Sequence, residues 1–284
     1  MPNSMPPFEP EPGAGTRAGQ KRRRLRRFGP LPVRTLIPNA LTILALCAGL
    51  TSVRFGLEGK FEAAVAAVII ASVFDALDGR IARMLQGTSK FGAELDSLTD
   101  FVNFGVAPVV LLYLWSLQDI GGLGWIAVLG YAVCCALRLA RFNVALEDPD
   151  KPVWTGNYFT GVPAPAGAGL AMLPLYLHFI GIPGVSGLSP LIALYVLGVA
   201  FLMVSPIPTF SGKRMGLRIR RDMVLPMLLA IGLSAAVILS YPWYSFAGLC
   251  FIYLASVPVA AARYRHHKRR TAQIRDGEFD TPIL

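Results

Sequence analysis

The sequence has few charged residues. Asp, Glu, Lys and Arg make up 15% of its 284 residues, whereas soluble domains carry about 25%, and 54% of the residues are hydrophobic. Uninterrupted apolar runs of about 18 or more residues recur along the chain, and each is long enough to cross the hydrocarbon core of a bilayer. A soluble globular domain is therefore excluded. The sequence predicts an all-α, polytopic transmembrane helical bundle.

Cysteine and histidine are also scarce. The four cysteines lie inside apolar stretches and have no histidine or cysteine neighbours at metal-ligand spacing, which is typical of small buried hydrophobic residues. They are Cys47, Cys134, Cys135 and Cys250. This pattern excludes a disulfide-linked secreted domain.

The apolar runs predict about eight membrane spans. The spans cover residues 36–56, 61–84, 98–118, 122–145, 160–182, 188–206, 224–241 and 243–262. An even number of spans puts both termini on one side of the membrane. If that side is the cytoplasm, only Arg54 and Lys60 of the 27 Lys and Arg residues lie outside, which the positive-inside rule favours. We expect a multi-pass protein of the inner (cytoplasmic) membrane with both termini inside.

Both ends of the chain are basic. Residues 1–33 are rich in proline, glycine and charge, and they are expected to form a disordered basic cytoplasmic tail. A second basic tail is expected at 263–284. Because the net charge of +10 lies beside membrane spans, anionic lipid headgroups are its expected partner, and nucleic acid is not.

Four aspartates stand in or at the ends of the second and third predicted spans. They are Asp75, Asp78, Asp96 and Asp100, and no second copy of this acidic segment occurs. A charged side chain at mid-bilayer costs about 2.5–3.5 kcal/mol, so such a cluster indicates a function. Spacings of three and four residues place each pair on one face of its helix. Two helices can therefore direct all four carboxylates to one place.

Convergent carboxylates repel one another unless a cation neutralises them, and Mg²⁺ and Mn²⁺ prefer oxygen ligands. The sequence therefore predicts a site for Mg²⁺ or Mn²⁺, with two ions expected. Gly79 and Gly92 would let a phosphate group or a neighbouring helix approach the backbone, and Arg83 can bind phosphate oxygens. Together these features indicate phosphoryl transfer. The alternative is that the aspartates cap helices and pair with Arg80 and Arg83.

The acidic segment resembles the signature of the CDP-alcohol phosphotransferase family. That signature reads Asp-x2-Asp-Gly-x2-Ala-Arg-x8-Gly-x3-Asp-x3-Asp, and residues 75–100 match every specified position. The resemblance implies a catalytic core at 34–210, followed by a basic loop and two C-terminal helices at 211–262. Further stretches are similar to the bacterial branch that transfers to serine. They are Pro38, Asn39 and Thr42, then Ser97–Pro108, Arg138–Asn143, Phe159–Pro165 and Phe210–Lys213.

The resemblance implies an enzyme that transfers a phosphatidyl group from CDP-diacylglycerol to L-serine, giving phosphatidylserine and CMP. By motif position, Asp75, Asp78, Asp96 and Asp100 would be metal ligands, and Asp100 would also be the catalytic general base. The CDP-binding residues would be Asn39, Thr42, Asp78, Gly79, Ala82, Arg83 and Gly92. A homodimer is implied as well. The small-residue face formed by Gly161, Ala164, Gly167, Ala168 and Ala171 would permit close contact between helices.

The acceptor is less constrained by the sequence. Serine needs a cation for its carboxylate and hydrogen-bond acceptors for its ammonium group. Candidates are Asn103, Arg138, Arg141, Asn143, Ser211 and Lys213. The first alternative keeps the chemistry and uses glycerol 3-phosphate or an inositol compound as acceptor. More remote alternatives are a membrane prenyltransferase, whose two acidic motifs would be well separated, and an ion transporter, which commonly shows internal repeats.

Overall fold

The computed structural model describes residues 33–85, 87, 89–147, 158–205, 208–210 and 223–258. The predicted N-terminal tail lies outside these residues except for Val33, and the tail at 263–284 lies outside them entirely. The described residues form a helical protein, as predicted.

Most of the described elements are helices. The first half of the chain forms α1 (Val33–Leu57), α2 (Phe61–Met84), α3 (Lys90–Asp100), the π-helical segment η1 (Phe101–Val106), α4 (Ala107–Trp115), the 3₁₀ turn η2 (Leu117–Ile120) and α5 (Gly122–Glu147). The second half forms β1 (Tyr158–Thr160), α6 (Ala164–Ala171), α7 (Leu173–Phe179), the 3₁₀ turn η4 (Val185–Gly187), α8 (Ser189–Val204), β2 (Pro208–Phe210), α9 (Val224–Ser240) and a last helix, Pro242–Pro258. The two short strands pair antiparallel, with Phe159 opposite Thr209.

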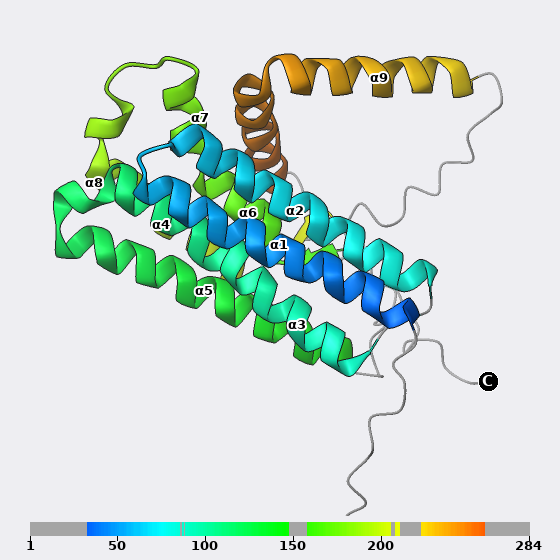
Figure 1. Cartoon of the computed structure of the whole chain (residues 1–284). Helices are drawn as coiled ribbons and strands as arrows, with labels where there is room; N and C mark the ends of the chain where they lie inside the picture. The colour runs from blue at the N-terminus through cyan, green and yellow to red at the C-terminus, as the bar shows by residue number, and fades with distance from the viewer. Residues whose placement is uncertain are drawn as a thin grey trace, which may run out of the picture. The chain divides into compact units, whose positions relative to one another are not determined.

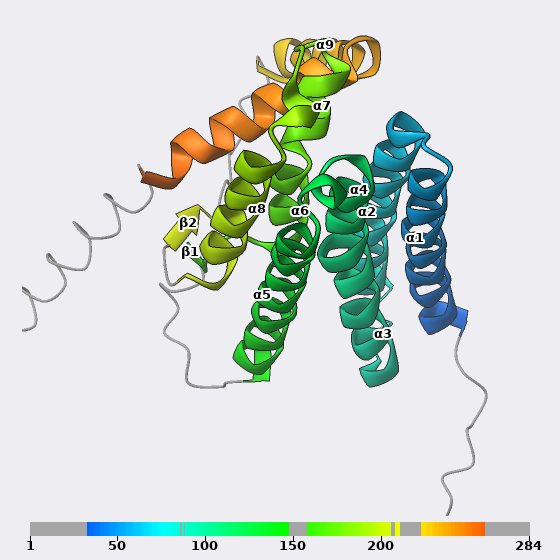
Figure 2. The same ribbon diagram turned by 90° about the vertical axis from the view of Figure 1, so that its left-hand side faces the viewer.

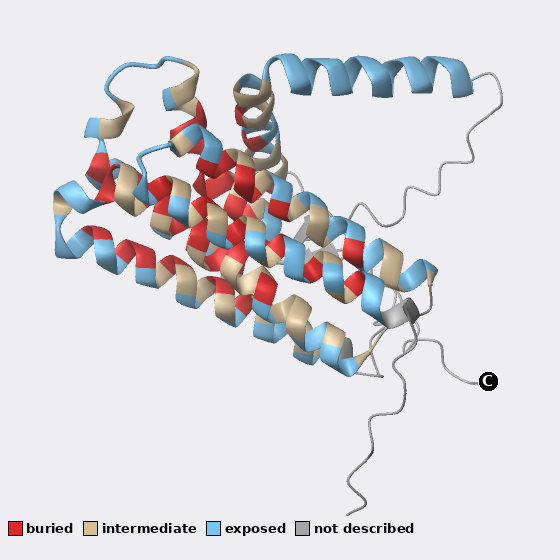
Figure 3. Cartoon of the chain, in the orientation of Figure 1, coloured by how far each residue is buried: buried red, intermediate tan, exposed pale blue. Residues whose placement is uncertain are grey.

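The helices bury a core where they meet. α1 lies beside α2 along its length, and α5 lies beside α8 (Figures 1 and 2). Large side chains from η1, α4, α5 and α8 fill the space between them, and they include Phe104, Leu111, Tyr131 and Met203. Figure 3 shows the buried residues concentrated at these contacts, whereas α9 is exposed along its whole length.

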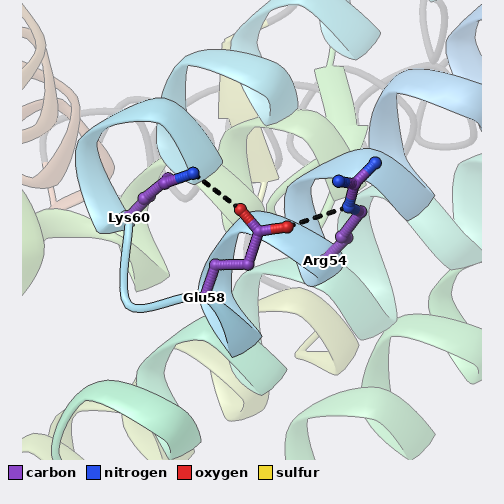
Figure 4. A network of polar contacts seen from close by, with 3 residues as sticks. All are labelled: Arg54, Glu58 and Lys60. Atoms are coloured by element: carbon purple, nitrogen blue, oxygen red, sulfur yellow. Dashed lines mark hydrogen bonds and ion pairs between the residues drawn. The ribbon is translucent and has the colours of Figure 1, made fainter.

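The turn from α1 to α2 is short and polar. Gly59 adopts a φ of 74° there, a left-handed conformation that glycine adopts at no steric cost. Glu58 accepts a hydrogen bond from Arg54 Nε at 2.9 Å and one from Lys60 Nζ at 2.8 Å (Figure 4). Hydrogen bonds from Lys60 and Arg54 lower the pKa of the Glu58 carboxyl. The two cations expected outside the membrane therefore share one carboxylate at the end of the α1–α2 hairpin.

Prolines interrupt two helices, and in each case a tyrosine hydroxyl replaces the missing backbone hydrogen-bond donor. Proline has no amide hydrogen, so the carbonyl four residues earlier loses its helical donor. Before Pro108, at the end of η1, Tyr131 Oη donates to the carbonyl of Phe104 at 3.1 Å. Before Pro174, at the break between α6 and α7, Tyr195 Oη donates to the carbonyl of Leu170 at 2.8 Å. Neighbouring helices thus satisfy backbone groups that the apolar surroundings leave without water.

The prediction of eight spans is not confirmed. Among the described residues, three helices are long and apolar enough to cross a membrane, namely Leu36–Leu57, Lys90–Trp115 and Gly122–Ala145. The helix Val224–Ser240 and the last helix pass the same test only as a pair bent by 114°, which raises the count to four.

Among the described residues, the other predicted spans do not meet this test of length and composition. α2 carries the charged residues of the acidic segment, α6 and α7 are separated at Met172, and α8 has only 16 residues. The chain is a multi-pass membrane protein with fewer full-length apolar helices than its hydrophobic runs suggest.

The small-residue face expected to serve a homodimer is used inside the chain. Ala164, Ala168 and Ala171 are buried, and a Cβ added at Gly167 would overlap the sulfur of Met203 on α8. These residues let α6 approach α8 closely. Within the described structure, these residues therefore make contacts inside the chain.

We predict that Tyr131→Phe destabilises the protein by about 1–3 kcal/mol, because it leaves the buried carbonyl of Phe104 without a donor. The measurement is unfolding by an anionic detergent in mixed micelles. Tyr113→Phe is the matched control, since Tyr113 packs its ring against Trp125 and its hydroxyl makes no hydrogen bond within the described residues. Equal stabilities for the two variants would contradict the role given to Tyr131.

Candidate active site

The acidic residues meet where α2 and α3 face each other. Asp75 and Asp78 lie one turn apart on α2, and Asp96 lies on α3. One carboxylate oxygen from each of these three lies within 4.8 Å of the other two. Asp78 is 3% exposed, and the other two are half-buried. The helical spacing therefore directs three of the four predicted side chains to a single point.

Asp100 lies at the edge of this group. Its carboxyl is within hydrogen-bonding range of Asp75, and its Oδ1 is buried with no hydrogen-bond partner among the described residues. Asp100 ends α3, and the π-helical segment η1 follows directly. π-Helical turns are common at functional sites, where they reorient side chains.

The aspartates do not pair with the neighbouring arginines. Within the described part of the chain, no Lys or Arg forms an ion pair with any of the four, and Arg83 Nε donates instead to the backbone carbonyl of Gly79 at 2.9 Å. The alternative that Arg80 and Arg83 neutralise them is therefore wrong. Three clustered carboxylate oxygens and the unpartnered Asp100 Oδ1 fit a hard divalent cation, which takes oxygen ligands.

Thr42 connects α1 to the acidic group. Its hydroxyl lies 2.7 Å from Asp78 Oδ2 and 3.1 Å from the carbonyl oxygen of Pro38. Thr42 is 4% exposed, so little water competes for this contact. Since Thr42 comes from a different helix, the hydrogen bond fixes the Asp78 carboxylate relative to α1.

A cleft of about 460 Å³ opens beside Asp78 and Asp96. All seven residues predicted to bind CDP line it: Asn39, Thr42, Asp78, Gly79, Ala82, Arg83 and Gly92. They come from α1, α2 and α3. The structure thus brings together residues more than fifty positions apart in the sequence, next to a group of carboxylates.

The two glycines of the acidic segment have different roles. A Cβ added at Gly79 would meet nothing within 4 Å, so this position opens directly into the cleft. At Gly92 a Cβ would come within 2.7 Å of Asn39 Oδ1. The amide of Gly92 also donates to Ser89 Oγ at 2.9 Å, which caps the start of α3. Gly79 therefore leaves room for a ligand, whereas Gly92 permits the close approach of α1.

The two arginines proposed to bind the acceptor both contact backbone carbonyls. Arg138 is buried on α5, donates through Nε to the carbonyl of Val162 at 3.2 Å and lies 5.6 Å from the centre of the Phe142 ring. Arg141 Nη1 donates to the carbonyl of Val204 at 2.8 Å. Both guanidinium groups therefore donate to backbone carbonyls.

The remaining acceptor candidates differ in their burial and in their hydrogen-bond partners. Asn143 Nδ2 donates to Ser97 Oγ at 2.9 Å and connects α5 to α3. Asn103 is fully buried against Gly49 of α1, and neither polar atom of its amide has a partner among the described residues. Ser211 and Lys213 lie outside the described residues.

Several residues of the cleft were not predicted. They are Pro38, Gly87, Ser89, Ala93 and Phe142. Ser89 has a detectable signal, because a serine directly before a helix is a common N-cap. Phe142 lies in the stretch Arg138–Asn143 of the resemblance, but the sequence does not indicate that this residue of α5 reaches a cleft formed mainly by α1, α2 and α3. The guanidinium of Arg138 lies over the ring of Phe142.

Comparison with known proteins agrees with this arrangement. A family model described as CDP-alcohol phosphatidyltransferase matches residues 35–206, and a second, CDP-alcohol phosphatidyltransferase 2, matches residues 222–258. The first match contains the acidic segment and the whole cleft. The second contains α9 and the last helix.

Similar proteins include three named CDP-diacylglycerol–serine O-phosphatidyltransferase. The one from Mycobacterium leprae is 41% identical over 232 residues, which cover 81% of this chain and 76% of the relative. The one from Mycobacterium tuberculosis is 37% identical over 232 residues, covering 81% and 79%. The one from Helicobacter pylori is 33% identical over 190 residues, covering 65% and 76%. With a family model matched over more than half its length, the chain belongs to the CDP-alcohol phosphatidyltransferase family.

Proposed function

We propose that this protein is a phosphatidylserine synthase, which transfers the phosphatidyl group of CDP-diacylglycerol to L-serine and releases CMP. The observation that carries the proposal is the cleft that ends at the carboxylate group, lined by all seven residues expected to hold CDP. The names of the similar proteins support serine as the acceptor. Membership in the family decides against a prenyltransferase and an ion transporter.

The donor is held by its nucleotide and diphosphate. In the proposal, Gly79 and Ala82 let the diphosphate approach α2 closely, and Arg83 provides positive charge beside it. Asp75, Asp78, Asp96 and Asp100 would hold Mg²⁺ or Mn²⁺, with two ions expected. Bound divalent ions neutralise the diphosphate and the departing CMP in reactions of this kind.

Asp100 is proposed as the general base. Its buried, unpartnered Oδ1 would take the proton from the serine hydroxyl. The serine oxygen then forms a bond to the phosphorus that carries diacylglycerol, and the bond from that phosphorus to CMP breaks. Holding the hydroxyl next to a carboxylate supplies both orientation and proton transfer.

The serine pocket is proposed on the α5 side of the carboxylates. Arg138 and Arg141 would bind the serine carboxylate, because a guanidinium forms strong hydrogen bonds with a carboxylate. Asn103 has free hydrogen-bonding capacity three residues after Asp100, and Asn143 lies on the same helix as the arginines. Ser211 and Lys213 complete the proposed set.

We also propose the orientation and assembly of the protein. The site lies at the end of α2 opposite the Glu58 turn, and the positive-inside rule assigns that end to the cytoplasm of a cell with an inner membrane. The core at 34–210, the C-terminal part at 211–262 and two basic tails form the proposed division of the chain. A homodimer is proposed on family resemblance alone, and chemical crosslinking in native membranes tests it.

A competition assay tests the acceptor. Purified membranes receive CDP-diacylglycerol and Mn²⁺ or Mg²⁺, with serine, glycerol 3-phosphate and inositol compounds supplied together. We expect CMP release and phosphatidylserine, both only when the metal is present. Formation of a different phospholipid would show that the acceptor is another alcohol and not serine. Absence of CMP release with every alcohol would contradict the proposed function itself.

Asp100→Asn should lose at least 10²–10⁴-fold in turnover, roughly what a general base contributes, while the protein still inserts into the membrane. Asn keeps the size of the side chain and removes its ability to accept a proton. CMP release measures the activity, and the amount of protein extracted from the membrane is the control. Near-normal turnover would show that Asp100 is not the base.

Thr42→Val should weaken metal binding about 10–100-fold, which is the usual effect of losing a hydrogen bond to a metal ligand. The change removes the hydrogen bond to Asp78 and keeps the shape of the side chain. Mn²⁺ titration followed by electron paramagnetic resonance measures it. Thr42→Ser retains the hydroxyl and is the matched control. Equal Mn²⁺ affinities for the two variants would exclude the positioning role of Thr42.

A further inference from the structure

Two polar side chains next to Asp100 have no hydrogen-bond partner. Thr99 is 1% exposed and Asn103 is fully buried, and neither the Thr99 hydroxyl nor either polar atom of the Asn103 amide is bonded among the described residues. Asp100 also has a free oxygen, but the proposed contacts with metal and serine account for it. Buried polar groups in folded proteins almost always have a partner, because a missing hydrogen bond is costly in apolar surroundings. A small polar ligand is therefore expected between Thr99 and Asn103.

Thr99 and Asn103 lie on the side of α3 and η1 that packs on α1. Residues on that side are spaced by four, three and four positions, which places them along one face of a helix. They are Gly92, Asp96, Thr99 and Asn103, and we call this row the polar seam. Gly92 and Asp96 line the cleft. At the other end a Cβ added at Gly49 of α1 would overlap Asn103 Oδ1, so the seam leads from the cleft into the interior of the bundle.

The polar groups of α1 near the seam are already engaged. Thr42 Oγ1 lies 2.7 Å from Asp78 Oδ2, and Ser52 Oγ donates to the carbonyl of Gly49 at 2.7 Å. The oxygen of the Asn103 amide is the atom closest to the Cβ position of Gly49, which leaves the amide nitrogen to donate elsewhere. Within the described residues, α1 therefore offers no partner to the seam.

We propose that an ordered water molecule is bound between Thr99, Asn103 and the Asp100 carboxylate. It would accept hydrogen bonds from the Thr99 hydroxyl and from Asn103 Nδ2, and it would donate one to Asp100. Three hydrogen bonds, roughly, is the usual number for a buried water. Asn103 follows Asp100 by three positions and Thr99 by four, so all three side chains can contact one molecule. An ionised carboxylate offers about four acceptor sites, so Asp100 keeps sites for metal and serine.

This water would hold the Asp100 carboxylate from the side opposite the substrate. Asp100 ends α3, and η1 follows directly, so the water would bridge the two segments where the type of helix changes. The inference rests on the proposed function, in which Asp100 is the general base. It also refines the place of Asn103, which has no exposed surface and would act on serine through the water. Thr99 and Asn103 are thus positioning residues.

Thr99→Val tests for the water without reference to activity. Valine keeps the shape of threonine and lacks the hydroxyl. In a dry seam the change removes an unsatisfied polar group and makes the protein more stable, whereas with water bound it removes a hydrogen bond and makes the protein less stable. We expect Thr99→Val to unfold at a lower fraction of anionic detergent than the unaltered protein. Equal or greater stability would overturn the inference.

Turnover tests the positioning role. We expect Thr99→Val and Asn103→Leu to lower kcat about 10–100-fold, the usual effect of losing a group that orients a metal ligand, with the KM values for serine and CDP-diacylglycerol unchanged. Thr99→Ser retains the hydroxyl and should retain most of the turnover. Ser52→Ala is the matched control. Ser52 is buried one turn after Gly49 and its hydroxyl bonds within α1, so its loss should lower stability and leave kcat unchanged.

The outcomes separate this inference from the proposed function. Normal kcat in both Thr99→Val and Asn103→Leu would overturn the positioning role while the unaltered protein still makes phosphatidylserine. A raised KM for serine with normal kcat in Asn103→Leu would show that Asn103 contacts serine directly, which also overturns it. Absence of CMP release from the unaltered protein would contradict the proposed function, and the stability of Thr99→Val would still decide whether the seam holds water.

Discussion

Three carboxylates whose oxygen atoms lie within 4.8 Å of one another repel strongly where little water surrounds them. Rigid elements hold them together, and no Lys or Arg in the described part of the chain forms an ion pair with them. α2 and α3 set their spacing, and Thr42 fixes Asp78 from α1. Ser89 caps the first turn of α3, so Asp96 and Asp100 project from a fixed starting point. The packing of α1, α2 and α3 can be understood as the support for a cation.

The same face of α2 serves two kinds of chemistry. Toward its C-terminal end the helix presents Gly79 to an open, polar cleft, and toward its middle it presents Val68 to an apolar cavity. Asp75 lies between the two. The two environments lie at a fixed separation along the helix. A single straight helix provides that separation more accurately than a loop would, because its rise per residue is constant.

The sequence predicts the chemistry of the site better than its surroundings. Helical spacing is enough to place Asp75, Asp78 and Asp96 together, because two adjacent helices determine their positions. Phe142 could not be predicted, since its place in the cleft depends on how α5 packs against α3. The small-residue face of α6 is visible in the sequence, but the sequence does not say which neighbour it meets, and the neighbour is α8. The count of eight spans is not confirmed, and hydrophobic runs do not reveal a break such as that at Met172.

The paired use of proline and tyrosine has a consequence for how such a sequence can change over time. With any other residue at 174, the backbone amide could serve the Leu170 carbonyl, and the hydroxyl of Tyr195 would be dispensable. With proline at 174, the Tyr195 hydroxyl donates to this carbonyl in place of the missing amide. The same holds for Pro108 and Tyr131. The tolerance of each tyrosine to substitution therefore depends on a residue on another helix, a form of epistasis that would make the two positions of each pair drift together.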